Sequence, residues 1–174
     1  MGSAANRIIG DFDFTEALKL TPLDRMRNAV SLARRRLADQ GALGYFMIPP
    51  IPDRGATDAE LDALQLGVGV DLPEEYAEFL RSWRYLIADD GYQVWGLDHE
   101  GVSIGRPWVS DQHRDGHRYL VFGHYWRYAD GDQLLFDLDD PATPVVAYLH
   151  EHGPSFERYA PTFSLALWRM LNEE

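Results

Sequence analysis

Several short motifs in this chain carry the residue types of catalytic sites. Residues 101–105 read Gly-Val-Ser-Ile-Gly, a match to the G-x-S-x-G pattern that presents a nucleophilic serine on a sharp turn between a strand and a helix. Charged residues precede this motif where an apolar strand should end, and no amphipathic helix follows it. We therefore expect Ser103 to lie in an ordinary strand, and a serine hydrolase is the weaker interpretation.

The histidines invite a second chemical interpretation, a metal site. His113 and His117 are four residues apart, a spacing that puts two imidazoles on one face of a helix, where they suit a metal ion. The residues between them favour a polar turn instead, and His150 and His152 stand at the end of an expected strand. Cysteine is absent, which excludes disulfides, thiolate catalysis and Cys-ligated zinc. We expect these histidines to be surface loop residues, with no bound metal and no cofactor.

Large aromatic side chains, an arginine and carboxylates gather between His124 and Asp132, in an expected loop between two strands. Aromatic residues in loops are typical of protein–protein hot spots, because they bury a large area at a modest cost in entropy. They also cover the edge of a core in many folds, and the residues leave both interpretations open. The candidate contacts are Trp126, Tyr128, Asp130 and Asp132, with Trp95 and Trp108 as weaker candidates for the same patch.

The net charge of the protein indicates which class of macromolecule it can bind. The 174 residues include 28 acidic and 16 basic side chains, a formal net charge of −12, and the negative charge is concentrated after residue 40. A protein with this negative charge repels phosphate backbones, so we expect no direct binding of nucleic acid. The same field attracts a basic protein.

No segment of the sequence predicts insertion into a membrane. The most apolar stretch, Leu43 to Ile51, is short and contains Gly44, Pro49 and Pro50. It cannot span a bilayer, and no signal peptide is recognisable in the first thirty residues. We expect a cytoplasmic protein, and the sequence leaves its oligomeric state open.

Hydrophobic periodicity predicts helices in the first half of the chain. Thr21-Pro22 opens an Arg-rich amphipathic helix, Thr57 and Glu60 form a capping box for a second, and Leu72-Pro73 begins a third. The arginines of the first helix permit docking of a partner as well as ordinary packing. Residues 1–20 have no clear period and predict an irregular arm, and the three prolines at 49, 50 and 52 predict an extended connector.

After Gly91 the period changes to that of strands. We expect strands at residues 92–97, 102–104, 119–122, 133–138 and 145–150, and a closing helix after Pro161. The connection 139–144 is too short for a crossover helix, so its flanking strands should pair antiparallel. The predicted class is α+β, a mostly antiparallel β-sheet meander packed by flanking helices.

A series of short motifs runs through residues 57–171: Leu66-Gly67, Leu72-Pro73 and the helix after them, Gly96, Ala129 to Asp132, and the strands that follow. In order and spacing these motifs resemble the SUKH superfamily, which includes fungal cell-wall-synthesis regulators and many bacterial immunity proteins. Residues 1–56, with the Arg-rich helix, have no counterpart in the pattern. The expected organisation is an N-terminal arm, helix and connector over 1–56 and a SUKH-like domain over 57–174.

The resemblance implies an α+β fold and a binding role without catalysis. Bacterial members of the superfamily neutralise toxins, often nucleases or deaminases, by direct contact. The leading hypothesis is therefore an immunity-type protein that occludes a basic toxin domain. A regulatory scaffold that docks signalling or cell-envelope proteins is the alternative, and an enzyme that uses Ser103 or a His-ligated metal is the third.

Overall fold

The structure is a computed structural model, and it describes residues 8–40, 50–88, 91–101, 104–111, 113–151 and 155–173. Within these residues, five helices and a seven-stranded antiparallel sheet confirm the predicted α+β class. The helices are α1 (Thr15–Leu18), α2 (Pro22–Asp39), α3 (Asp58–Val68), α4 (Glu74–Trp83) and α5 (Phe163–Asn172). The strands are β1 (Leu86–Ile87), β2 (Tyr92–Val94), β3 (Trp108–Ser110), β4 (Tyr119–Tyr125), β5 (Gln133–Asp137), β6 (Val145–Leu149) and β7 (Ser155–Ala160).

The helix starts follow the capping residues of the sequence. The Thr21 hydroxyl accepts a hydrogen bond from the main-chain N–H of Asp24 and so caps α2. At α3 both bonds of the capping box form, since the N–H of Glu60 donates to the Thr57 hydroxyl and the N–H of Thr57 donates to the Glu60 carboxylate. Gly69 then ends α3 at a φ of 84°, a conformation that favours glycine.

The strands form one sheet in the order β1-β2-β4-β5-β6-β7, and β3 pairs with the part of β4 that β2 leaves free. Every pair is antiparallel, including the predicted β5–β6 hairpin. β7 lies at one end of this order, so it has β6 on one side and an open edge on the other.

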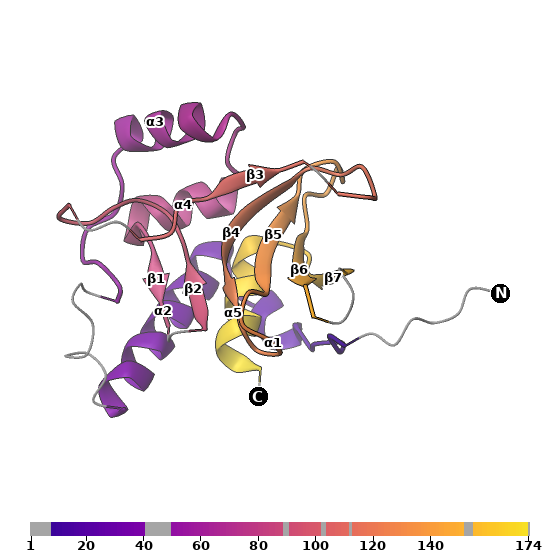
Figure 1. Ribbon diagram of the computed structural model, residues 1–174. Helices are drawn as coiled ribbons and strands as arrows, with labels where there is room; N and C mark the ends of the chain where they lie inside the picture. The colour runs from indigo at the N-terminus through magenta and orange to yellow at the C-terminus, as the bar shows by residue number, and fades with distance from the viewer. Residues whose placement is uncertain are drawn as a thin grey trace.

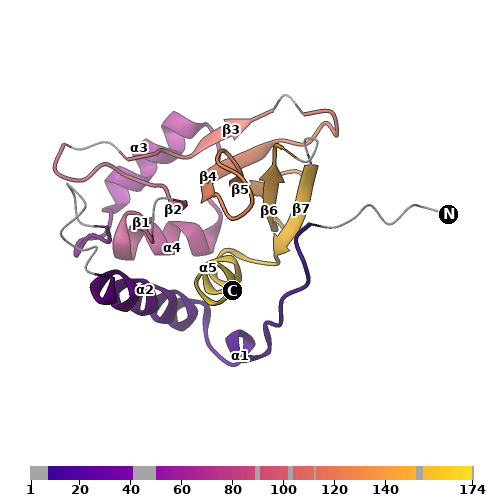
Figure 2. The same ribbon diagram turned by 60° about the horizontal axis from the view of Figure 1, so that its bottom comes forward.

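One face of the sheet packs against α2, α4 and α5, which lie together on the same side of it (Figures 1 and 2). Tyr76 of α4 joins the two layers: its ring centroid lies 5.6 Å from those of Phe122 and Phe136 in the sheet, and 5.3 Å from that of Phe163 in α5. These side chains are buried and belong to one large apolar cluster. The main core therefore lies between the helices and this face.

The apolar stripe of α2 points into that core. Met26, Val30, Ala33 and Leu37 are buried, as the helical spacing predicts. Arg25 is buried too, and its guanidinium donates to the Ala17 carbonyl at 2.8 Å and to the Ser164 hydroxyl at 3.2 Å. This arginine thus connects α2 with α1 and α5, and the helix is an integral part of the packed structure.

The N-terminal arm, defined here as residues 8–14, runs beside β7 and α5 (Figure 2). The Arg169 guanidinium on α5 donates to the carbonyls of Gly10 at 2.8 Å and Tyr159 at 3.0 Å, and it lies over the ring of Phe12. The N-terminal arm is therefore attached to the last strand and the last helix. The short helix α1 follows it, within residues 1–20 that were predicted to be irregular.

The structure differs from the sequence prediction in the strands. β1, β3 and β7 were not predicted, because they are short or because charged residues interrupt them. Of the expected strand 102–104, Ile104 is not in a strand, and the other two residues lie outside the described part of the chain. β2 ends at Val94, two residues before Gly96, which packs against the main chain of Arg84. β4 is longer than predicted, because His124 pairs with both Gln93 and Gln133.

Candidate partner-binding surface

The sheet face opposite the helices, called the outer face here, carries a second apolar cluster. Alternate residues of the central strands point to it, as the period of two in a strand requires. Its buried members are Trp95, Tyr119, Val121, Leu135 and Val146. The sheet is therefore apolar on both faces, although α2, α4 and α5 cover only one of them.

Aromatic rings from β4, β7 and the connection between β3 and β4 close over the aliphatic side chains of this cluster. Tyr119 of β4 and Phe156 of β7 stack with ring centroids 4.2 Å apart and planes 2° apart, although β5 and β6 lie between their strands. His113 meets the ring of Phe156 edge-on at 4.7 Å. Tyr148 and Phe156 are only half-buried, so the cluster presents aromatic surface to the exterior.

Hydrogen-bonded groups border this aromatic cluster. The His117 Nδ1 lies 2.9 and 2.8 Å from the two carboxylate oxygens of Asp137, and this bond raises the pKa of His117 above its ordinary value. The hydroxyl of Tyr119 donates to the carboxylate of Asp115 at 2.5 Å. These bonds connect the loop before β4 to the sheet and so define one margin of the outer face.

A second aromatic group lies toward the other end of β4. The rings of Trp95, His124 and Trp126 follow one another, with centroid distances of 4.8 Å and 4.4 Å. Burial lowers the pKa of His124, which therefore favours the neutral imidazole. Trp95 rests against Gly105, where a Cβ would come within 2.6 Å of the indole ring. Residue 105 must therefore be a glycine for the Trp95 ring to occupy this position.

Three of the predicted contact residues share the outer face. Trp108 is opposite Val121 in the β3–β4 register and is 47% exposed. Trp126 is half-buried beside His124, and Trp95 is almost fully buried beneath it. Trp108 and Trp126 thus present surface, while Trp95 supports the ring of His124.

The other three predicted residues occupy the β4–β5 connection and its base. Tyr128 is 38% exposed, and its hydroxyl donates to the Ile8 carbonyl of the arm at 3.3 Å. Asp130 is exposed at the turn. Asp132 is fully buried, and its carboxylate accepts from the main-chain N–H of His150 at 3.0 Å and lies 2.8 Å from the His150 Nδ1. Asp132 therefore holds the base of this connection in place and does not present its carboxylate at the surface.

The residues that suggested catalysis do not come together in the described part of the chain. His113 and His117 lie in the connection between β3 and β4, where His113 Nε2 is 2.6 Å from the Ser110 hydroxyl and His117 pairs with Asp137. Among the described residues, no three His, Asp or Glu side chains gather where they could hold a metal ion. Ser103 and His152 lie outside the described residues.

Sequence reasoning missed the residues that form the aromatic cluster. Tyr119 and Tyr148 lie in strands that were predicted, but no face was assigned to them, and the third partner, Phe156, lies in a strand that was not predicted. Glu157 and Arg158 follow Phe156 directly and hide the apolar pattern of β7. One hydrophobic residue next to two charged residues is a weak indication of a strand. It was not enough to predict β7 or the stacking of Phe156 on Tyr119.

Comparison with known proteins gives one family. The model of the SMI1/KNR4 family (SUKH-1) matches residues 55–167, which is more than half of the chain. No curated protein and no solved structure matches it. The matched range contains α3, α4 and all seven strands, so it includes every strand of the outer face.

Proposed function

The chain belongs to the SMI1/KNR4 (SUKH-1) family, and from this premise we propose that it is a non-enzymatic immunity protein that neutralises a cognate toxin by direct binding. Membership fits immunity or regulator-like roles, and the family is generally non-catalytic and linked to protein–protein interaction. Within the described residues, no helix is both long and apolar enough to cross a membrane. We place the toxin on the outer face of the sheet.

The aromatic surface of the outer face is the observation that carries this proposal. Trp108 is among the few large apolar side chains that are substantially exposed, and Trp126, Tyr148 and Phe156 add half-buried rings on the same face. Rings held by packing lose little further entropy when a partner covers them, which is why Trp and Tyr dominate hot spots. A partner seated here would complete a layer over the second apolar cluster.

Charge supports the choice of a basic partner. The net charge of −12 creates a negative field that speeds the approach of a positively charged protein. A toxin that acts on nucleic acid is typically basic, because it must bind phosphates. Asp130, exposed at the turn beside Tyr128, is the carboxylate that we expect to contact such a toxin.

The test is co-expression with the product of an adjacent toxin-like reading frame. Growth should be rescued by the intact protein, and Trp108→Ala and Trp126→Ala should each weaken binding of the purified toxin at least about tenfold. Leu66→Ala is the matched control, because Leu66 is 85% exposed on α3 and does not belong to the apolar cluster of the outer face. Equal toxicity with and without the protein would refute the proposal.

A second candidate function, a regulatory scaffold, is favoured by the exposed arginines of α2. Arg34, Arg35 and Arg36 are exposed on the side of α2 that faces away from the core, and among the described residues only Arg34 has an ion pair, a 3.8 Å contact with Asp53. An acidic partner could dock there. Replacing all three arginines with glutamine should abolish that docking without unfolding the chain, whereas it should leave rescue from a basic toxin intact.

A further inference from the structure

β7 is an edge strand of the sheet in the described part of the chain. Ser155–Ala160 pairs with β6 on one side only, and alternate residues of an edge strand direct their main-chain N–H and C=O groups away from the sheet. The Tyr159 carbonyl already accepts from Arg169. Among the residues that the structure describes, no hydrogen bond engages the other outward main-chain groups of β7.

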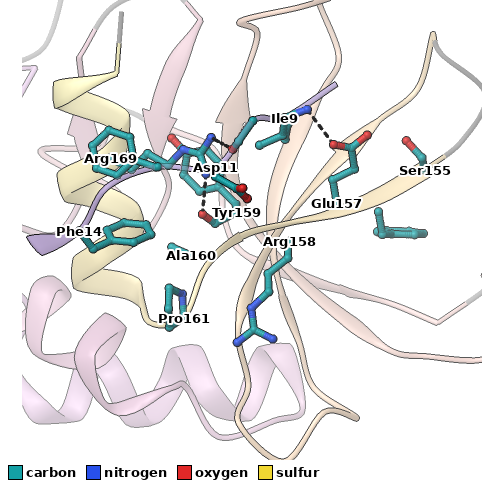
Figure 3. A pocket seen from close by; sticks show the side chains of 13 residues that line it. Ile9, Asp11, Phe14, Ser155, Glu157, Arg158, Tyr159, Ala160, Pro161 and Arg169 are labelled. Atoms are coloured by element: carbon teal, nitrogen blue, oxygen red, sulfur yellow. Dashed lines mark hydrogen bonds between the residues drawn. The ribbon is translucent and has the colours of Figure 1, made fainter. Parts of the chain in front are cut away.

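The N-terminal arm lies near this edge but does not pair with its main chain. The main-chain N–H groups of Ile8 and Ile9 donate to the side-chain carboxylate of Glu157, at 3.3 and 2.8 Å. A cleft of about 1080 Å³ separates arm residues 9–12 and Phe14 from residues 155–161, with Arg169 among the residues that line it (Figure 3). The arm therefore forms one wall of a cleft whose other wall is the strand edge.

The walls of this cleft combine aromatic rings with one free carboxylate on the side of the arm. Phe12, Phe14, Phe156 and Tyr159 supply aromatic surface. Glu157 and Arg169 are already engaged in the bonds described above, and Arg158 is exposed. Asp11 lines the cleft and is exposed, and its side chain has no hydrogen bond or ion pair with any other described residue.

We propose that this cleft binds an extended segment of a partner protein, which adds to β7 as a further strand. Such a strand directs alternate side chains toward the arm, so apolar residues would meet Phe12 and Phe14, and a basic residue would pair with Asp11. The negative net charge of the protein favours a basic segment for the same reason. This site shares Phe156 with the outer face. Its occupant is held by the main chain at the edge of β7, so the proposal does not depend on the function proposed above.

A second copy of the chain is a poorer occupant than a partner segment. Two copies of β7 related by a twofold axis would pair antiparallel, and the residue at the axis would lie opposite its own copy. An axis at the middle of β7 would therefore place Glu157 opposite Glu157 or Arg158 opposite Arg158. Like charges in opposite positions destabilise a strand pair. The charges at the centre of β7 thus disfavour self-pairing and leave the edge open to a different sequence.

Amide hydrogen exchange on the full chain tests this proposal. The probes are blocked heptapeptides in which apolar and basic residues alternate, and their controls are the same peptides with N-methylated main chains. Binding of the first set should slow exchange at alternate β7 amides about tenfold, and the methylated set should have no effect. Asp11→Lys should weaken binding about tenfold, whereas Asp62→Lys, the same charge change at an exposed site on α3, should not.

Four results would overturn the proposal. The first is unchanged exchange of the β7 amides at millimolar peptide, and the second is protection confined to other strands. The third is equal binding of the methylated peptides. The fourth is protection of β7 that rises with protein concentration when no peptide is present, which would identify a second copy as the occupant. The proposed toxin binding to the outer face is measured separately and survives any of these.

Discussion

The ring of Phe156 on the last strand lies flat against the ring of Tyr119 on β4, with 4.2 Å between their centroids. Phe156 is only half-buried, and Tyr119 is almost fully buried beneath it and its neighbours. The contact joins two strands that are not neighbours, so it stabilises the curvature of the sheet around Leu135 and Val146. It is the structural basis of the outer face, and the first prediction measures it.

We expect Tyr119 and Phe156 to be energetically coupled. A double-mutant cycle with Tyr119→Ala and Phe156→Ala should give a coupling free energy of about 1 kcal/mol, typical of a stacked aromatic pair. Urea denaturation of the four proteins measures it. The cycle of Tyr119→Ala with Leu66→Ala is the control and should be additive, because Leu66 is exposed on α3. Additivity in both cycles would mean that stacking adds no free energy of unfolding beyond the burial of each ring by itself.

The two histidines His117 and His124 should titrate on opposite sides of the ordinary histidine pKa of 6.5. The bond to Asp137 raises the pKa of His117, and burial lowers that of His124. NMR titration of the imidazoles measures both midpoints. Because the pKa of His117 is higher in the folded state, the stability from its bond is complete below pH 6.5 and is lost as the pH rises through the folded pKa.

Asp137→Asn is the control for the His117 titration. It removes the charged partner, so the midpoint of His117 should fall toward 6.5 while that of His124 stays low. Identical midpoints for the two histidines in the unmodified protein would contradict the assignment of the His117–Asp137 bond.

Glu60 should stabilise the fold through Arg84. Arg84 is buried, and both of its terminal nitrogens donate to the Glu60 carboxylate, which helps to lower the pKa of Glu60 to about 2. Glu60→Gln keeps a residue suited to the capping box but removes the charge, and it should cost about 2 kcal/mol at neutral pH. Urea denaturation measures the loss.

The pH dependence of this effect follows from the lowered pKa. The contribution of Glu60 is complete above its ordinary pKa of 4.5 and is lost as the pH falls from there toward 2. The difference between Glu60→Gln and the unmodified protein should therefore shrink at pH 3. Asp62→Asn, on an exposed site of the same helix, should show no such difference at either pH.

Gly96 should tolerate no side chain. A Cβ there would lie 1.9 Å from the carbonyl oxygen of Arg84 and 2.5 Å from Leu80, so Gly96→Ala must displace the main chain. We expect a loss of about 3 kcal/mol, as for overpacking of a core. Gly67→Ala is the matched control: it lies in α3 with nothing within 4 Å of the new methyl group, and it should stabilise the protein by about 0.5 to 1 kcal/mol. Thermal unfolding of both variants decides the matter, and similar melting temperatures would contradict the close approach at Gly96.

The helices were predictable because their signals are local. Thr21, Thr57 and Glu60 mark two helix starts within a few residues, and the structure confirms both. The predicted β5–β6 hairpin was confirmed for the same reason. These features depend on neighbouring residues alone.

The outer face was less predictable because it depends on contacts between distant strands. The sequence indicated Trp108 and Trp126 as surface aromatics, but it could not show that Tyr119 and Phe156 meet above β5 and β6. It also could not show that Asp132 is buried by His150, because a carboxylate in an acidic loop is usually exposed. Whether the six residues contact a partner stays a prediction.

The attachment of the arm to Arg169 has a consequence for synthesis on the ribosome. Residues Ile8 to Phe14 are translated some 150 residues before their partners on β7 and α5. The nascent arm must therefore remain undocked until β7 and α5 have left the exit tunnel, so these contacts form late in folding.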